Sequence, residues 1–136
     1  MTNLELINDI LLLIGVLGEG ITASPEQGAL ALRQANELAD SWAEDEVLIN
    51  WSSNSDVTED CPLIGMELAA FKPHLAIRLC PYFGRDPSPM LLAMANGAYE
   101  KLVHAQLVRS IQPVELQLPL AEGGLPFVDI TDPSFR

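Results

Sequence analysis

Three consecutive carboxylates, Glu44, Asp45 and Glu46, form the densest cluster of side chains that could carry out acid–base chemistry. Glycoside hydrolysis needs two carboxyl groups that converge on one cleft, whereas neighbours along a helix point to different sides. We therefore interpret these carboxylates as the solvated end of an acidic helix. Of the two histidines, His104 is expected on an exposed helix face, and His74, next to Pro73, at a helix restart or an interface.

Other groups that could react are isolated from one another. Cys61 and Cys80 form no CxxC pair and have no histidine at ligand spacing, which argues against a zinc site and a disulfide framework and indicates a reducing, cytoplasmic origin. The sequence has no glycine-rich phosphate loop and no GxSxG motif. We therefore expect a protein that is not an enzyme and holds no cofactor and no metal.

The charge balance also restricts function. Seven basic and nineteen acidic side chains give a net charge of −12, the opposite of what phosphate contacts require, so specific nucleic-acid binding is disfavoured. Residues 1–60 carry twelve acids and one base, so the acidic character belongs to the N-terminal half. The longest apolar run, residues 10–17, is far shorter than the roughly 20 residues of a membrane span. We expect a soluble, unprocessed chain without a membrane partner.

These residues must be positioned by one small domain of 136 residues. Aromatic residues make up only 6%, and Ala and Leu dominate, which favours closely packed helices. We predict an all-α bundle of about four helices over residues 1–111, with an extended arm at 112–136. The helices are expected at 3–17, 25–46, 67–82 with a kink or restart at Pro73, and 89–111. A short β-hairpin is expected within 47–62.

Capping signals and apolar spacing assign positions within these helices. Thr2 with Glu5, and Ser24 with Gln27, fit capping boxes at the first two helix starts. The residues expected in the core are Leu38, Trp42, Leu75, Leu79 and Leu102.

Two further sets of apolar residues could each make one of two kinds of contact. Leu12 and Val16 are apolar on an otherwise polar helix side, which predicts contact with another subunit or with residues 47–62. Met90, Met94, Ala95 and Ala98 could line a ligand groove, but a helix-packing face is favoured at this spacing.

The C-terminal arm has the alternating pattern of a strand. Prolines recur at 113, 119, 126 and 133, and aliphatic side chains alternate with Glu, Gln and Pro. Because no strand in the chain is expected to pair with it, we predict that the arm binds a partner molecule. The residues assigned to this contact are Val114, Leu116, Leu118 and Leu120, followed beyond Gly123–Gly124 by Leu125, Phe127, Val128 and Ile130.

Several motifs, taken in order over about residues 3–105, resemble the head-to-tail adaptor family of short-tailed bacteriophages, also called packaged-DNA-stabilisation or tail accessory proteins. The motifs are Leu6–Ile7–Asn8 leading to Leu13–Ile14–Gly15, Ser24–Pro25–Glu26, Asn36 to Trp42, Leu75 to Gly84, and Pro87–Ser88 before the Ala-rich helix. Each is a general helix-bundle signal, and the resemblance lies in their order and spacing.

This resemblance implies a structural virion protein. It would be made in the host cytoplasm and form a dodecameric ring at the portal vertex. The ring would join the portal protein to the tail or nozzle protein and help to retain packaged DNA, which passes through the channel. The resemblance also implies that the C-terminal arm binds the portal or a neighbouring copy. Two alternatives stay open from the residues themselves. One is an acidic helical regulatory module that forms a small dimer. The other, less favoured, is a cell-wall hydrolase that uses residues 44–46.

Overall fold

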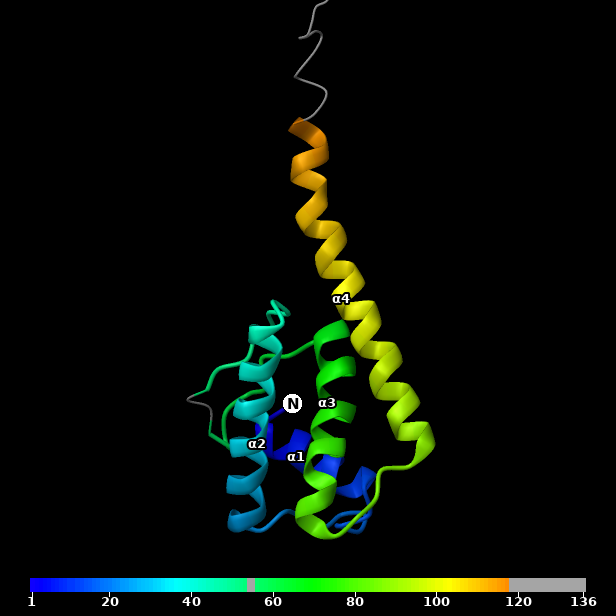
Figure 1. The fold of residues 1–136 in the computed structure, drawn as a ribbon. Helices are drawn as coiled ribbons and strands as arrows, with labels where there is room; N and C mark the ends of the chain where they lie inside the picture. The colour runs from blue at the N-terminus through cyan, green and yellow to red at the C-terminus, as the bar shows by residue number, and fades with distance from the viewer. Residues whose placement is uncertain (54–55, 118–136) are drawn as a thin grey trace, which may run out of the picture. The chain divides into compact units, whose positions relative to one another are not determined.

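A computed structural model of the chain describes residues 1–53 and 56–117, with side chains described through residue 109. The helices in chain order are α1 (Asn3–Leu13), α2 (Pro25–Glu44), α3 (Met66–Leu79), the short 3₁₀ helix η1 (Cys80–Phe83) and α4 (Pro89–Gln117) (Figure 1). The described residues contain no β-strand, which confirms the all-α prediction. Residues Met1–Leu102 form one compact unit, and α4 continues from it into a second unit that begins at Val103.

The first two helices start where their capping residues predict. The Thr2 hydroxyl accepts a hydrogen bond from the Glu5 amide at 3.2 Å, and the Glu5 carboxylate accepts one from the Thr2 amide at 2.7 Å. Ser24 and Gln27 form the same reciprocal pair at 3.2 and 2.9 Å. Each pair satisfies amides that have no partner within the first helical turn.

Helix α1 is shorter than predicted, because it ends at Leu13 instead of Leu17. Gly15 has a φ of +81°, a conformation that favours glycine and stops the helix. The amides of Val16 and Leu17 both donate to the carbonyl of Leu11, at 2.9 and 3.3 Å. Leu12 and Val16 therefore do not share a helical face, which corrects that part of the prediction.

The helix does not restart at Pro73, which corrects that alternative of the prediction. Helix α3 continues through this proline from Met66 to Leu79 and is followed directly by η1. Pro73 has no amide hydrogen to donate to the carbonyl of Ala69, a loss worth about 3 kcal/mol in a helix interior. The helix persists because its apolar face is fully buried on both sides of the proline, at Phe71 and Leu75.

The predicted hairpin at 47–62 is not formed. Its described parts, 47–53 and 56–62, contain no strand, and residues 57–61 form backbone hydrogen bonds with the start of the chain. The carbonyls of Val57 and Glu59 accept from the amides of Leu4 and Asn3, at 2.9 and 2.8 Å. These hydrogen bonds give partners both to the amides at the start of α1 and to the carbonyls of the loop. Thr2 and Asp60 form an isolated antiparallel bridge.

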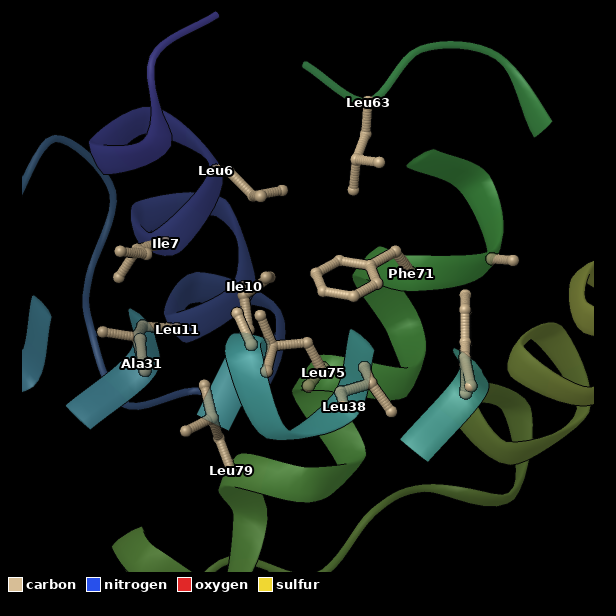
Figure 2. Packing of buried hydrophobic residues seen from close by; sticks show 14 of the residues in the cluster. Leu6, Ile7, Ile10, Leu11, Ala31, Leu38, Leu63, Phe71, Leu75 and Leu79 are labelled. Carbon is tan, nitrogen blue, oxygen red and sulfur yellow. The ribbon is translucent and has the colours of Figure 1, made fainter. Parts of the chain in front are cut away.

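The hydrophobic core is built mainly by α1, α2 and α3 (Figure 2), and Leu91 and Leu102 of α4 also belong to it. Side chains of α1 and α3 face one another across it, and Leu63, from the loop before α3, lies at one end. Gln34 is the buried polar residue of α2, and its side-chain oxygen accepts from Arg78 Nε at 3.0 Å. The residues expected in the core, Leu38, Trp42, Leu75, Leu79 and Leu102, are all buried.

Helix α4 is longer than predicted and includes Pro113, Val114 and Leu116. The extended arm therefore does not begin at residue 112. Residues 115–117 are Glu, Leu and Gln, which are all good helix formers. This local preference outweighs the alternation of apolar and polar residues. The remaining arm positions, Leu118, Leu120, Leu125, Phe127, Val128 and Ile130, lie outside the described residues. Over 1–53 and 56–117, no helix has both the length and the apolar character needed to cross a membrane.

Candidate functional site

The carboxylates singled out for catalysis lie at the exposed end of α2. Glu44 ends α2, Asp45 caps it, and Glu46 follows with a φ of +64°; all three side chains are exposed. His104 is exposed as well, whereas His74 is half-buried. Among the described residues, no three His, Cys, Asp or Glu side chains come together in a group that could hold a metal ion.

His74 belongs to an aromatic cluster around Trp42. Its ring lies 5.5 Å from that of Trp42 and 5.4 Å from that of Tyr99. Because a carbonyl oxygen can only accept, the contact of 3.1 Å with Ala95 O means that His74 Nε2 carries a proton and donates it. Burial lowers the pKa of His74, and this hydrogen bond only partly opposes the effect. The imidazole is therefore packed among aromatic rings, and its pKa is shifted toward the neutral form.

The pKa values of Cys80 and Tyr99 are also shifted toward the protonated forms. Burial raises the pKa of the Cys80 thiol, and the negative charge of Asp86 adds to the effect. Burial raises the pKa of Tyr99, with a contribution from Asp45. Since the thiolate is the nucleophilic form of cysteine, the environment of Cys80 disfavours nucleophilic chemistry.

The surface offers apolar features that are better candidates. A cavity of about 320 Å³ lies between α3 and the first half of α4, lined by Met66, Ala69, Ala93, Met94, Gly97, Ala98 and Lys101. We call it the methionine groove. The two methionine side chains are about half exposed, at 50% and 48%. Flexible, polarizable methionines over small residues are typical of adaptable protein-binding surfaces.

The Met and Ala line noted in the sequence is divided between two roles. Ala95 is fully buried and packs inside the unit, whereas Met94 and Ala98 line the methionine groove and Met90 is exposed. Periodicity placed these residues on one helix but did not indicate Met66 and Ala69, which come from α3. Only the packing of α3 against α4 brings the two sets together.

A second apolar surface lies at the end of α1. Leu12 and Leu13 are 43% and 46% exposed, and Ile21, in the loop that follows, is 58% exposed. We call these three residues the α1-end surface. Leu12 is thus exposed, and its contact with another subunit stays a prediction. Val16 instead packs against the core cluster and is partly buried.

Another hollow, of about 370 Å³, lies beside the start of α2. It is lined mainly by apolar residues, including Leu4, Ala23, Leu32 and Val57. Gly28 is buried at its edge, and a Cβ atom there would lie 3.4 Å from Val57 Cγ1. The glycine therefore lets the loop containing Val57 approach α2, which gives this hollow a role in packing.

No protein-family model matches the sequence, and a search of curated proteins finds no match.

Proposed function

We propose that this chain is a structural adaptor of the head-to-tail junction of a short-tailed bacteriophage. In this proposal, copies of the chain form a dodecameric ring that binds the portal protein on one side and the tail or nozzle protein on the other. The ring closes the packaged head and helps to retain its DNA at the portal vertex of the virion.

The observation that carries the proposal is the agreement between the resembling motifs and the helix boundaries. Ser24–Pro25–Glu26 caps and opens α2, and Asn36 to Trp42 contributes buried residues of that helix. Leu75 to Gly84 covers the end of α3 and η1, where Gly84 has a left-handed φ of +66°. The motifs thus supply helix starts, helix ends and buried residues, as expected for the helical bundle that the adaptor resemblance implies.

The chemistry of the unit supports a structural role. The reactive side chains with resolved pKa shifts, His74, Cys80 and Tyr99, are all shifted toward their neutral forms by burial. A protonated thiol or phenol is a poor nucleophile at neutral pH, and the Nε2 proton of His74 is donated to the carbonyl of Ala95.

The uneven charge also fits a channel for DNA. Residues 1–60 carry a net charge of −11, from twelve acids and one base. A ring that presents this half to its channel would repel the phosphate backbone and let DNA pass without binding.

The decisive experiment mixes purified protein with portal rings encoded by the same genome and measures the mass of the complex. We expect a discrete complex of one portal ring with many copies of this chain. Virions lacking the chain should lose their DNA after packaging. A protein that stays a small dimer and does not bind the portal would favour the regulatory-module alternative.

A separate measurement addresses the hydrolase alternative. The purified protein should not cleave peptidoglycan. Cleavage that disappears in Glu44→Gln would establish an enzyme and overturn the purely structural role.

A further inference from the structure

The first part of α4, residues 89–102, packs against the other helices through a small set of side chains. Leu91, Ala95 and Leu102 are buried, and Ala98 and Tyr99 are partly buried. The other members of the buried cluster come from α1, α2, α3 and the segment between α2 and α3. Most of the buried apolar side chains therefore belong to the other three helices and not to α4.

The connection before α4 allows this helix to move as one piece. Gly84 follows η1 with a φ of +66°, and residues 85–88 are exposed or partly buried. The Ser88 hydroxyl accepts a hydrogen bond from the amide of Leu91 at 3.1 Å, and the Ser88 carbonyl accepts one from the amide of Leu92 at 3.1 Å. Because the capping residue directly precedes the helix, α4 keeps its cap when it moves.

His74 of α3 lies where α2, α3 and α4 meet. Its Nε2 proton is donated to the carbonyl of Ala95 at 3.1 Å, and its ring lies 5.4 Å from the ring of Tyr99. It also lies 5.5 Å from the ring of Trp42, which itself packs against Tyr99 at 5.1 Å. Among the described residues, no hydrogen-bond partner contacts the other ring nitrogen, Nδ1.

Protonation of this ring would disfavour the packed arrangement. An imidazolium carries a proton on each nitrogen, so the new Nδ1 proton would lie half-buried among aromatic rings, with no acceptor from the part of the chain that the structure describes. When α4 moves away, water can hydrate the charged ring. In agreement, burial lowers the pKa of His74 in the packed arrangement.

Ionisable side chains from all three helices flank this contact. Asp45 acts on Tyr99, whose phenol is shifted toward its neutral form, and Arg78 is paired with Glu37. The pKa of His74 is set first by burial and then by the Ala95 carbonyl, so these charges do not reverse its direction. The segment 47–53 carries no ionisable side chain. The flanking groups are Asp45 at the end of α2, Glu67 and Arg78 on α3, and Tyr99, Glu100 and Lys101 on α4.

We propose that His74 makes the packing of α4 sensitive to acid: the neutral ring holds residues 89–102 against the core, and its protonation separates them from it while α1–α3 stay folded. Separation would expose the ring of Trp42 and divide the methionine groove, whose walls come from α3 and α4. The closed form should be fully stable above about pH 6.5 and lose stability as pH falls toward the pKa of the packed ring. This inference does not depend on the adaptor function.

Amide hydrogen exchange measures the separation in the full chain. Protection of residues 93–102 is compared with that of α2 at about pH 7.5 and about pH 5.5, after correction for the pH dependence of intrinsic exchange. We expect α4 to be less protected than α2 at both values, and its protection to fall on acidification. Equal protection of the two helices would show that they open together and would overturn the proposal.

Two substitutions separate protonation from packing. His74→Gln keeps a donor that can reach the Ala95 carbonyl, and His74→Phe keeps a ring; neither side chain can take up a proton. Both variants should lose the fall in α4 protection between the two pH values. The control is His104→Gln, at an exposed histidine of α4, which should keep the parental pH dependence. Thermal melting monitored by circular dichroism verifies that each variant is folded.

Three results refute the proposed role of His74. The first is a parent whose α4 protection does not change between the two pH values. The second is a folded His74 variant that keeps the parental dependence. The third is loss of that dependence in His104→Gln, which would assign the effect to the other histidine.

Discussion

At the scale of single residues, Trp42 connects three helices. It is 4% exposed on α2, and its ring lies edge-on to Phe71 of α3 at 5.6 Å and tilted against Tyr99 of α4 at 5.1 Å. Aromatic pairs in these geometries add stability beyond the area that they bury. Trp42 is therefore a packing anchor and has no free face on which a ligand could stack.

Replacing this anchor should leave a large cavity. We expect Trp42→Ala to lower the free energy of unfolding by about 3–5 kcal/mol, as measured by urea denaturation. Trp51→Phe is the control: it keeps a ring to stack on Phe71 and loses only the hydrogen bond to Asn36, so it should cost about 1 kcal/mol. A melting temperature of Trp42→Ala within a degree of the parent would contradict the assigned role.

His74 should make stability depend on pH. Burial lowers its pKa in the folded chain below the ordinary value of 6.5, so between these two values the unfolded chain binds more protons. The stability that neutral His74 contributes is complete above about pH 6.5 and is lost as pH falls toward the folded-state pKa. The unfolding free energy of the parent should therefore decline more steeply on acidification than that of His74→Gln. His104→Gln, at an exposed site, should follow the parent.

At the scale of elements, α3 shows a local preference overcome by burial. Pro73 is itself buried, in a helix whose apolar face reaches the core before and after it. The cost of a proline inside a helix is smaller than the stability gained by burying several large side chains of that helix at about 1.5–3 kcal/mol each. The helix therefore continues where local rules favour a break.

Replacing Pro73 should stabilise the protein. Pro73→Ala restores an amide donor and relieves the ring clash, worth about 3 kcal/mol, and loses the burial of about two methylenes, near 0.8 kcal/mol each. We expect the unfolding free energy to rise by about 1 kcal/mol in urea titrations. Pro89→Ala, at the first position of α4, should change it by less than about 0.5 kcal/mol, since a proline there displaces no hydrogen bond. A loss of stability in Pro73→Ala would show that the ring's packing dominates.

At the scale of the whole molecule, all residues of the buried cluster belong to the unit Met1–Leu102. A chain lacking residues 113–136 should therefore keep a cooperative melting transition and an unfolding free energy within about 1 kcal/mol of the parent. We expect the same truncation to abolish stable attachment to the portal. Sedimentation with portal rings measures this attachment, and a truncated chain that binds with parental affinity would refute a role for the C-terminal segment.

Features that depend on local chemistry could be predicted from the amino-acid sequence alone. Capping hydroxyls and carboxylates act within one helical turn, so Thr2 and Ser24 were enough to locate two helix starts. The apolar periodicity of α2 and α3 likewise indicated residues such as Leu38 and Leu79, which the structure buries, because helix geometry alone places them on one face.

Features that depend on residues distant in the chain could not be predicted and are seen only in the folded structure. Residues 56–61 form a loop instead of a hairpin strand because the unpaired amides at the start of α1 offer them hydrogen bonds. The methionine groove exists because α3 and α4 bring Met66 beside Met94 across 27 intervening residues. Periodicity in one segment carries no information about which other segment packs against it, since that choice depends on the total area buried by the whole chain.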